Sequence, residues 1–406
     1  MRERLARTYG LRLLLEPRFQ VTALSLLAVL VVAFRVVQFA ALTRAPQFGY
    51  DVSAYWLGGR HLLDGEPIYT AAQLAGQYAP QGQGLYLYPP ALAALFMPVA
   101  ALFPDGYLTL AWLWAGIGAA ILAATVAWIA GAEGIASDRR GLLLLLAAAF
   151  AFPPVVGELV LGNVHLELLG LFALAWWGVR RGDRRGETVA GLAIGAAALV
   201  KLVPVVVVVW FLATGRTRAA LWTIIGAAVL AAVTLPLTGL QPWLDYPAVL
   251  ANLGRPSDAT DALAPAVWLG DLVGPGIARL AVLAAATVAI AWSARRLVEP
   301  ASYAVAVAAA VLVAPAVFHH YLAMLVLPML LALVASERRG WLAAAYLAMW
   351  GGQQPALGGL GWLLNRALPA LGALLVPVGL LVWGRPSAPS SGPTESTARP
   401  PGGARS

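Results

Sequence analysis

The sequence predicts an all-α integral membrane protein, built as a polytopic bundle of about 11–13 transmembrane helices with an amphipathic first outer loop. Of its 406 residues, 61% are hydrophobic and only 11% are charged, and the mean hydropathy is +0.78. A soluble domain carries about 25% charged residues. This apolar content is enough for about twelve crossings of roughly 20 residues each. A water-soluble globular protein is therefore excluded.

The distribution of charge supports the same fold class. The formal net charge is +8, and the arginines stand in short clusters between apolar runs. Such clusters are typical of topology signals, so we expect membrane lipids, and no nucleic acid, as partners. The sequence contains no cysteine, which excludes disulfides, thiolate metal sites and cysteine nucleophiles.

The chain begins with a basic segment and a first apolar helix. Residues 1–18 carry five arginines, which predicts a cytoplasmic N-terminus and an outward crossing by Phe19–Leu42. No small-residue cleavage site follows, so we expect this helix to be retained. Residues 43–90 form the first extracytoplasmic loop. The apolar stretch that then runs to Phe103 is short and contains Pro98, which favours a re-entrant or interfacial segment.

The basic clusters also orient the helices that follow. The predicted segments are Tyr107–Ala130 inward, Gly141–Phe152 outward, Pro153–Asn163 at the outer face and Val164–Val179 inward. The apolar run Thr188–Thr214 has an arginine pair at each end, and a single crossing would leave one pair outside. The positive-inside rule therefore predicts a helical hairpin with its tip near Lys201 and Pro204 at the outer face.

The remainder of the chain follows the same alternation. The predicted segments are Ala219–Leu237 outward, a loop from Thr238 to about Pro275, Gly276–Ala294 inward, Ala301–Phe318 outward, Tyr321–Ala335 inward, Trp341–Trp350 outward and Gly361–Gly384 inward. Residues 19–384 thus form the transmembrane domain. Residues 385–406, rich in Pro, Ser, Gly and Arg, are expected to form a disordered cytoplasmic tail.

Under this topology the ionisable groups most able to do chemistry share the outer side. They are His61, His165, His319, His320, Asp51, Asp64, Glu66, Asp105, Glu158, Glu167 and Asp245. Lys201 is the only lysine among the 27 Lys and Arg residues, and it interrupts an apolar run. An ammonium there suits a phosphate oxygen. The alternative is an amine that extends from a helix end to the lipid headgroups.

Three further positions each allow a functional and a structural interpretation. Asp51 is a candidate base that shares a helix face with Tyr55, but an aspartate before an apolar stretch is also a good helix N-cap. His319 and His320 can bond a phosphate or orient a base, or form a polar interfacial turn, and their adjacency disfavours a shared metal. Arg366 can pair with a lipid phosphate or extend to the membrane surface.

The sequence lacks a phosphate-binding glycine loop, an HExxH motif and a GxSxG motif. Their absence argues against an ATP-driven or hydrolase function.

Taken in order, the chain resembles the GT-C glycosyltransferases that use polyprenyl-phosphate sugars, and within them glycosyltransferase family 87. The matching pieces are Gly49-Tyr50-Asp51 with Tyr55, Leu63-Asp64-Gly65-Glu66-Pro67-Ile68-Tyr69, Tyr88-Pro89-Pro90 with Pro98, Gly162-Asn163, Ala190-Gly191-Leu192, Lys201-Leu202-Val203-Pro204 and His319-His320-Tyr321. The resemblance departs at Asn163 and His165, where members often carry a Gly-Gln-x-Asn element. A later Asn-Gln-Ser element is absent between Pro247 and Pro275.

The resemblance implies an inverting mannosyltransferase with a GT-C-like bundle in the bacterial plasma membrane and an active site outside the cytoplasm. The donor would be a polyprenyl-phosphate sugar, and the acceptor a hydroxyl of a glycolipid or glycan. Asp51 would be the base, and the donor phosphate would contact Lys201, His319, His320 and Arg366. The acceptor cavity would be lined by Tyr50, Tyr55, Tyr88, Glu158, Asn163 and His165. This scheme requires neither a cofactor nor a metal.

Two other functions remain open at this stage. A transferase of arabinofuranose or another pentose could use the same donor lipid, and the sequence does not separate the sugars. A non-enzymatic lipid or sugar transporter or flippase would also need polar groups in a helical bundle. The transporter is disfavoured because the chain has no obvious two-half repeat and its ionisable groups gather on one face.

Overall fold

The computed structural model describes residues 17–76, 84–253, 262–352 and 359–387. Within them the chain is helical, and its extended pairings are two isolated β-bridges. The prediction of an all-α fold is confirmed. Most of the basic N-terminus 1–18 and of the tail 385–406 lies outside the described residues.

The first half of the fold consists of α2 Pro17–Leu42, α3 Tyr50–Asp64, α4 Ala71–Leu74, α5 Pro90–Leu102, α6 Leu108–Ala132, α7 Arg139–Ala151, α8 Pro153–Leu161, α9 His165–Arg181 and α10 Arg184–Val200. The second half consists of η1 Val203–Val206, α11 Val207–Ala213, α12 Thr217–Thr238, α13 Gln241–Asn252, α14 Pro265–Val273, α15 Pro275–Arg296, α16 Glu299–Leu312, η3 His319–Leu325, α17 Val326–Ala335, α18 Gly340–Ala348, α19 Leu360–Trp362, the π-helical turn η4 Leu363–Ala367 and α20 Leu368–Trp383.

The structure supports a multi-pass membrane protein but differs from the predicted number of spans. Among the described residues, five helices are long and apolar enough to cross a membrane, or six if α7 and α8, bent by 61°, form one span. The expected 11–13 crossings counted shorter apolar helices, such as the 14-residue α16, as complete spans. A helix of that length is too short to cross alone, because a crossing takes about 20 residues.

The helix positions otherwise follow the apolar runs, except that both long segments predicted as loops contain helices; α3 and α4 lie within residues 43–90. The segment from Thr238 to Pro275 was expected to be a loop, but it contains α13 and α14. These helices were missed because the segment contains three prolines, one at the start of each helix and one inside α13, and proline is usually a sign of a loop. Proline is tolerated in the first turn of a helix because its missing N–H has no intrahelical partner there.

The predicted hairpin is present, and it places Lys201 at its far end. Helix α10 ends at Val200, and the chain returns through η1 and α11 before α12 begins. Arg218 at the start of α12 donates its Nε–H to the carbonyl of Arg184 at the start of α10, at 3.1 Å. The two arginine clusters therefore lie at the same end of the bundle, and the tip lies at the other.

Two glycines let α10 and α12 pack closely side by side. A Cβ on Gly191 would lie 2.3 Å from the carbonyl oxygen of Ala219, and a Cβ on Gly195 would lie 2.6 Å from that of Thr223. The order of these contacts shows that the two helices run parallel. Such close backbone approach through small residues is typical of membrane helices.

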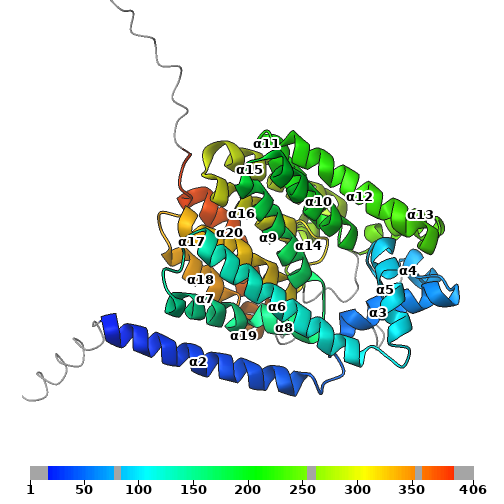
Figure 1. The fold of residues 1–406 in the computed structure, drawn as a ribbon, viewed down its shortest axis with the longest axis horizontal. Helices are drawn as coiled ribbons and strands as arrows, with labels where there is room; N and C mark the ends of the chain where they lie inside the picture. The colour runs from blue at the N-terminus through cyan, green and yellow to red at the C-terminus, as the bar shows by residue number, and fades with distance from the viewer. Residues whose placement is uncertain (1–16, 77–83, 254–261, 353–358, 388–406) are drawn as a thin grey trace, which may run out of the picture.

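The bundle surrounds α16, which is buried from Ala301 to Leu312. Helix α2 lies along one edge of the molecule (Figure 1), and its leucines and valines are largely exposed, as expected for a surface facing lipid. Helices α3, α4 and α5 form a separate group at one end, beside α13 (Figure 1). The first turn of α3 is the part of this group that reaches the site described next.

Candidate active site

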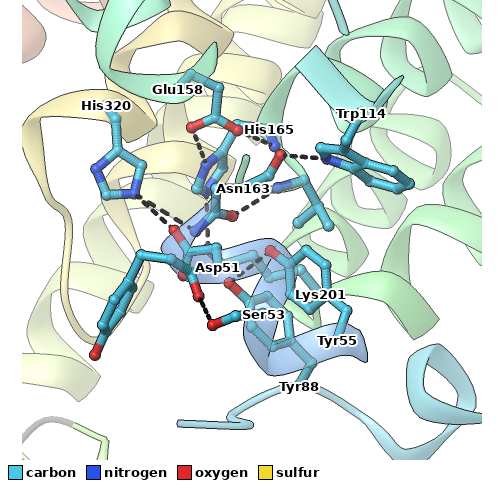
Figure 2. Close-up of polar contacts among 12 residues, drawn as sticks. Asp51, Ser53, Tyr55, Tyr88, Trp114, Glu158, Asn163, His165, Lys201 and His320 are labelled. Atoms are coloured by element: carbon cyan, nitrogen blue, oxygen red, sulfur yellow. Dashed lines mark hydrogen bonds and ion pairs between the residues drawn. The ribbon is translucent and has the colours of Figure 1, made fainter. Parts of the chain in front are cut away.

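Four segments that are far apart in the sequence meet at one largely buried cluster of polar side chains (Figure 2). The start of α3 supplies Asp51, the turn between α8 and α9 supplies Asn163, and His165 follows as the first residue of α9. The break after α10 supplies Lys201, and η3 supplies His320. The structure thus brings together five of the residues that the sequence analysis selected.

Backbone contacts fix the position of Asp51. Gly49 is the N-cap of α3 in the left-handed conformation, with φ of 71°, and its N–H donates to the carbonyl of Val160 at 2.8 Å. A Cβ at Gly49 would lie only 2.6 Å from Cβ of Ala111, so the position requires glycine. Since the cap is Gly49, the alternative that Asp51 is the N-cap is wrong. Asp51 lies in the first helical turn, and its carboxylate bonds side chains of the site instead of capping the helix.

A second glycine docks the α8–α9 turn against α3. Gly162 has φ of 68°, and a Cβ there would lie 2.3 Å from Cγ2 of Val52. The turn places the side chain of Asn163 in hydrogen-bonding contact with Asp51. It also places Nδ2 of Asn163 at 3.5 Å from Nε2 of His320. The amide therefore links the aspartate to the histidine.

The surroundings of Asp51 suit a base that works near neutral pH. Burial raises the pKa of its carboxyl to about 6, against the opposing effects of the hydrogen bond from Asn163, the positive charge of Lys201 and the hydrogen bond from Tyr88. Nε2 of His320 lies 4.0 Å from Oδ2 of Asp51. A carboxylate with this pKa is ionised at pH 7 and still basic enough to accept a proton in a transition state.

Lys201 presents a partly buried cation to the same cluster. It lies just past the end of α10, where Pro204 follows. Its Nζ is 2.8 Å from Nε2 of His165, 3.7 Å from the ring centre of Tyr321 and 5.8 Å from that of Tyr88. The amine thus points into the protein, and the alternative of an amine that extends to the lipid headgroups is wrong.

Glu158 and His165 are bonded to each other beneath Lys201. The backbone N–H of His165 donates to Oε1 of Glu158 at 2.6 Å, and Nδ1 of His165 lies 3.0 Å from Oε2. Each side chain is at most 2% exposed. Both were predicted to line the acceptor cavity, but their polar atoms are occupied by the protein itself.

The remaining predicted residues lie around or away from the cluster. Tyr55 is fully buried, and its hydroxyl lies 3.1 Å from that of Tyr88. The carbonyl of Tyr50 accepts the hydroxyl of Ser53 at 2.6 Å. His319 contacts the carbonyl of Met349 at 2.9 Å instead of the cluster. Arg366 lies on η4, with its guanidinium 5.4 Å from the ring of Trp268.

Tyr321 was not predicted to have a role in the site, although its ring covers the ammonium of Lys201. The signal that could have indicated it is the triplet that it forms with His319 and His320. On the 3₁₀ turn η3, consecutive side chains point about 120° apart. Residues 320 and 321 can therefore face the cluster while residue 319 faces elsewhere.

Three of these residues also have the geometry of a metal site. Ligand atoms of Glu158, His165 and His320 lie within 4.8 Å of one another among the described residues. However, Nε2 of His165 is occupied by Lys201, and Glu158 bonds the other nitrogen of that ring. The ammonium therefore already supplies positive charge at this place.

Comparison with known proteins identifies the family of the chain. The sequence of residues 86–318 matches glycosyltransferase family 87. The chain belongs to this family. A family 87 protein with this bundle is a membrane glycosyltransferase. The matched segment contains Glu158, His165 and Lys201, whereas Asp51 precedes it and His320 follows it, so the geometry alone joins these two residues to the cluster.

One curated relative has a more specific name. The chain is 29% identical over 205 residues to a protein of Mycobacterium tuberculosis, the polyprenol-phosphate-mannose-dependent alpha-(1-2)-phosphatidylinositol mannoside mannosyltransferase. The alignment covers 48% of this chain and 46% of the relative, so about half of each protein is compared. No solved structure matches the chain.

Proposed function

We propose that this family 87 enzyme transfers mannose from polyprenyl-phosphate mannose to a hydroxyl of a glycolipid or glycan, with inversion at the anomeric carbon. The observation that carries the proposal is the meeting of a partly buried carboxylate, Asp51, with a partly buried ammonium, Lys201, in one cluster (Figure 2). The name of the relative supports the donor, since that protein depends on polyprenol-phosphate mannose.

The chemistry needs a base and a cation but no general acid. Asp51 accepts the proton of the acceptor hydroxyl as that oxygen forms a bond to the anomeric carbon. The bond from this carbon to the phosphate oxygen breaks at the same time, and its electron pair leaves with the polyprenyl phosphate. A phosphate monoester has a second pKa of about 6, so it departs without being protonated. Because attack and departure occur on opposite faces of the sugar, the configuration inverts.

Lys201 and His320 serve the departing phosphate in this scheme. An ammonium that is shielded from water stabilises the charge that develops on the phosphate more strongly than it would in solvent. Asn163 holds Asp51 by a hydrogen bond and lies between it and His320. The polyprenyl chain would occupy the membrane beside the apolar helices.

We place the reaction at the extracytoplasmic face of the plasma membrane. The argument is that Lys201 lies at the end of the hairpin opposite Arg184 and Arg218, and arginine clusters remain on the cytoplasmic side.

A transfer assay tests the proposed function. Detergent-purified protein is given radiolabelled polyprenyl-phosphate mannose and a membrane lipid extract as acceptor. We expect product from the wild type, and a loss of about 10²- to 10⁴-fold for Asp51→Asn and Lys201→Ala. Asp138→Asn is the matched control, because this residue caps α7 and asparagine is an equally good cap.

Each outcome has a defined meaning. Product from polyprenyl-phosphate arabinose alone would replace mannose by a pentose. No product with any polyprenyl-phosphate sugar would overturn the proposal and favour a transporter. If Asp51→Asn remained fully active, the base would be another residue.

A further inference from the structure

Glu158, His165 and Lys201 come from three consecutive elements and form a continuous chain of hydrogen bonds. Oε2 of Glu158 is 3.0 Å from Nδ1 of His165, and Nε2 of the same ring is 2.8 Å from Nζ of Lys201. Figure 2 shows the three side chains in line, with Asp51 on the side of Lys201. Of these three residues, the proposed mechanism uses only Lys201.

With Lys201 as an ammonium and Glu158 as a carboxylate, the donors and acceptors in these hydrogen bonds allow one arrangement of protons. A lysine ammonium can only donate, so Nε2 of His165 must accept from it. The proton of the neutral ring then resides on Nδ1, which donates to the carboxylate of Glu158. The other oxygen of Glu158 accepts the backbone N–H of His165 and so fixes the orientation of the carboxylate.

These hydrogen bonds also explain how the ammonium of Lys201 is oriented. One of its three N–H bonds is held by His165, and the ring of Tyr321 covers another side at 3.7 Å. The N–H bonds that remain are available to a phosphate oxygen. A freely rotating lysine would lose rotamer entropy on binding the donor, whereas this one is held in place beforehand.

Burial excludes a direct contact of Glu158 or His165 with the acceptor. Their side chains are 1% and 2% exposed, and each polar atom discussed above has a partner within the protein. Glu158 and His165 can therefore affect the reaction only through the position of Lys201.

We propose that Glu158 and His165 are positioning residues that fix the ammonium of Lys201 for the donor phosphate, an inference that rests on the proposed function. The arrangement resembles the way in which carboxylates orient the histidines that bind metals, but the group held at the end of the chain is an ammonium. The other titratable groups that face Lys201 are Asp51 on α3, Tyr88 before α5, and His320 and Tyr321 on η3.

Because Lys201 is the only lysine of the chain, its side chain can be observed without interference. Labelling with ¹⁵N at Nζ gives a single lysine side-chain signal in the detergent-solubilised protein. We expect one slowly exchanging ammonium signal in the wild type. In Glu158→Gln and His165→Leu it should exchange faster and change to the neutral amine at a lower pH, because the carboxylate or the acceptor nitrogen is lost.

The kinetic expectation is a selective loss. In both variants kcat should fall about 10- to 100-fold, as is typical when one hydrogen bond to a charged group is lost, while the KM of the acceptor stays the same. Glu158→Asp should recover part of the loss, because it keeps the carboxylate. Glu167→Gln is the matched control: this glutamate lies on α9 two residues after His165, and its carboxylate oxygens have no hydrogen-bond partner among the described residues. Its charge acts on Glu158, but its loss breaks none of the hydrogen bonds between Glu158, His165 and Lys201.

The two readouts separate this inference from the proposed function. If the wild type transfers no sugar but the ¹⁵N signal responds to Glu158→Gln and not to Glu167→Gln, the positioning chain stands and the proposed function fails. If transfer occurs but neither the ¹⁵N signal nor kcat responds to Glu158→Gln and His165→Leu, the proposed positioning of Lys201 is wrong. Should both variants fail to fold, ¹⁵N-histidine spectra of the wild type decide, because a proton on Nε2 of His165 would overturn the arrangement and a proton on Nδ1 would support it.

Discussion

The base and the cation of the candidate site are held in different ways. Asp51 is placed by the backbone, since Gly49 bonds Val160 and Gly162 packs against Val52. Lys201 is placed by side chains, through His165 and Glu158. The first arrangement tolerates no added atom at its two glycines, whereas the second depends on the charge and protonation of its members. Substitutions on the two sides should therefore fail for different reasons.

The largest effect is expected from Gly162→Ala, which tests the backbone side. The new Cβ would lie 2.3 Å from Val52, at a residue with positive φ. We expect a loss of stability of about 2–4 kcal/mol and a loss of activity, because the turn that carries Asn163 must move. Thermal unfolding in detergent measures the loss of stability, and the transfer assay measures the loss of activity.

Gly182→Ala is the matched control for this change. Gly182 has a similar φ of 65°, but a Cβ there would meet nothing within 4 Å. Only the backbone strain remains, so the cost should be about 1 kcal/mol with unchanged activity. Equal effects of the two substitutions would contradict the importance of the contact between Gly162 and Val52.

The adjacent histidines provide a second test. His320 lies 4.0 Å from Asp51, while His319 bonds the carbonyl of Met349. We expect His320→Gln to lower kcat about 10- to 100-fold, because it removes a group beside the reacting atoms. His319→Gln should lower it less than about tenfold, since it changes only a contact with the backbone. The reverse order would show that the donor phosphate lies on the side of Met349.

The pH dependence tests the role of Asp51. Since its carboxyl has a pKa of about 6 and the base must be ionised, kcat/KM should fall about tenfold for each pH unit below 6. The hydrogen bond from Asn163 lowers this pKa, so Asn163→Ala should move the inflection to higher pH. Rates measured across pH 4.5 to 8, a range of about two units around the inflection, check both points. An inflection that does not respond to Asn163→Ala would belong to another group.

The smallest effect is expected from removal of metal ions. Because Lys201 already supplies positive charge next to Glu158, His165 and His320, treatment with EDTA should leave the transfer rate unchanged. A loss of activity that Mn²⁺ restores would place a metal on these three ligands. It would also contradict the positioning of Lys201 by His165.

The residues around Asp51 and those around Lys201 could be predicted from the sequence to different extents. Lys201 was selected because a lone lysine interrupts an apolar run and proline follows, and both the hairpin and the buried amine are present. Asp51 was selected by residue type and family resemblance, but whether it caps a helix depended on where α3 begins. Glu158 and His165 were selected as well, yet the sequence could not show that they bond each other and Lys201.

The sequence by itself determined the class of the fold, the ends of most long helices and the arginine ends of the hairpin. These features follow from local composition, because a chain with 61% hydrophobic residues is stable only as helices in lipid. Only the tertiary structure decided which polar groups meet. Apolar periodicity records that a helix is buried but not which neighbour buries it, so the contact between residues as distant as Asp51 and His320 is set by the packing of the whole bundle.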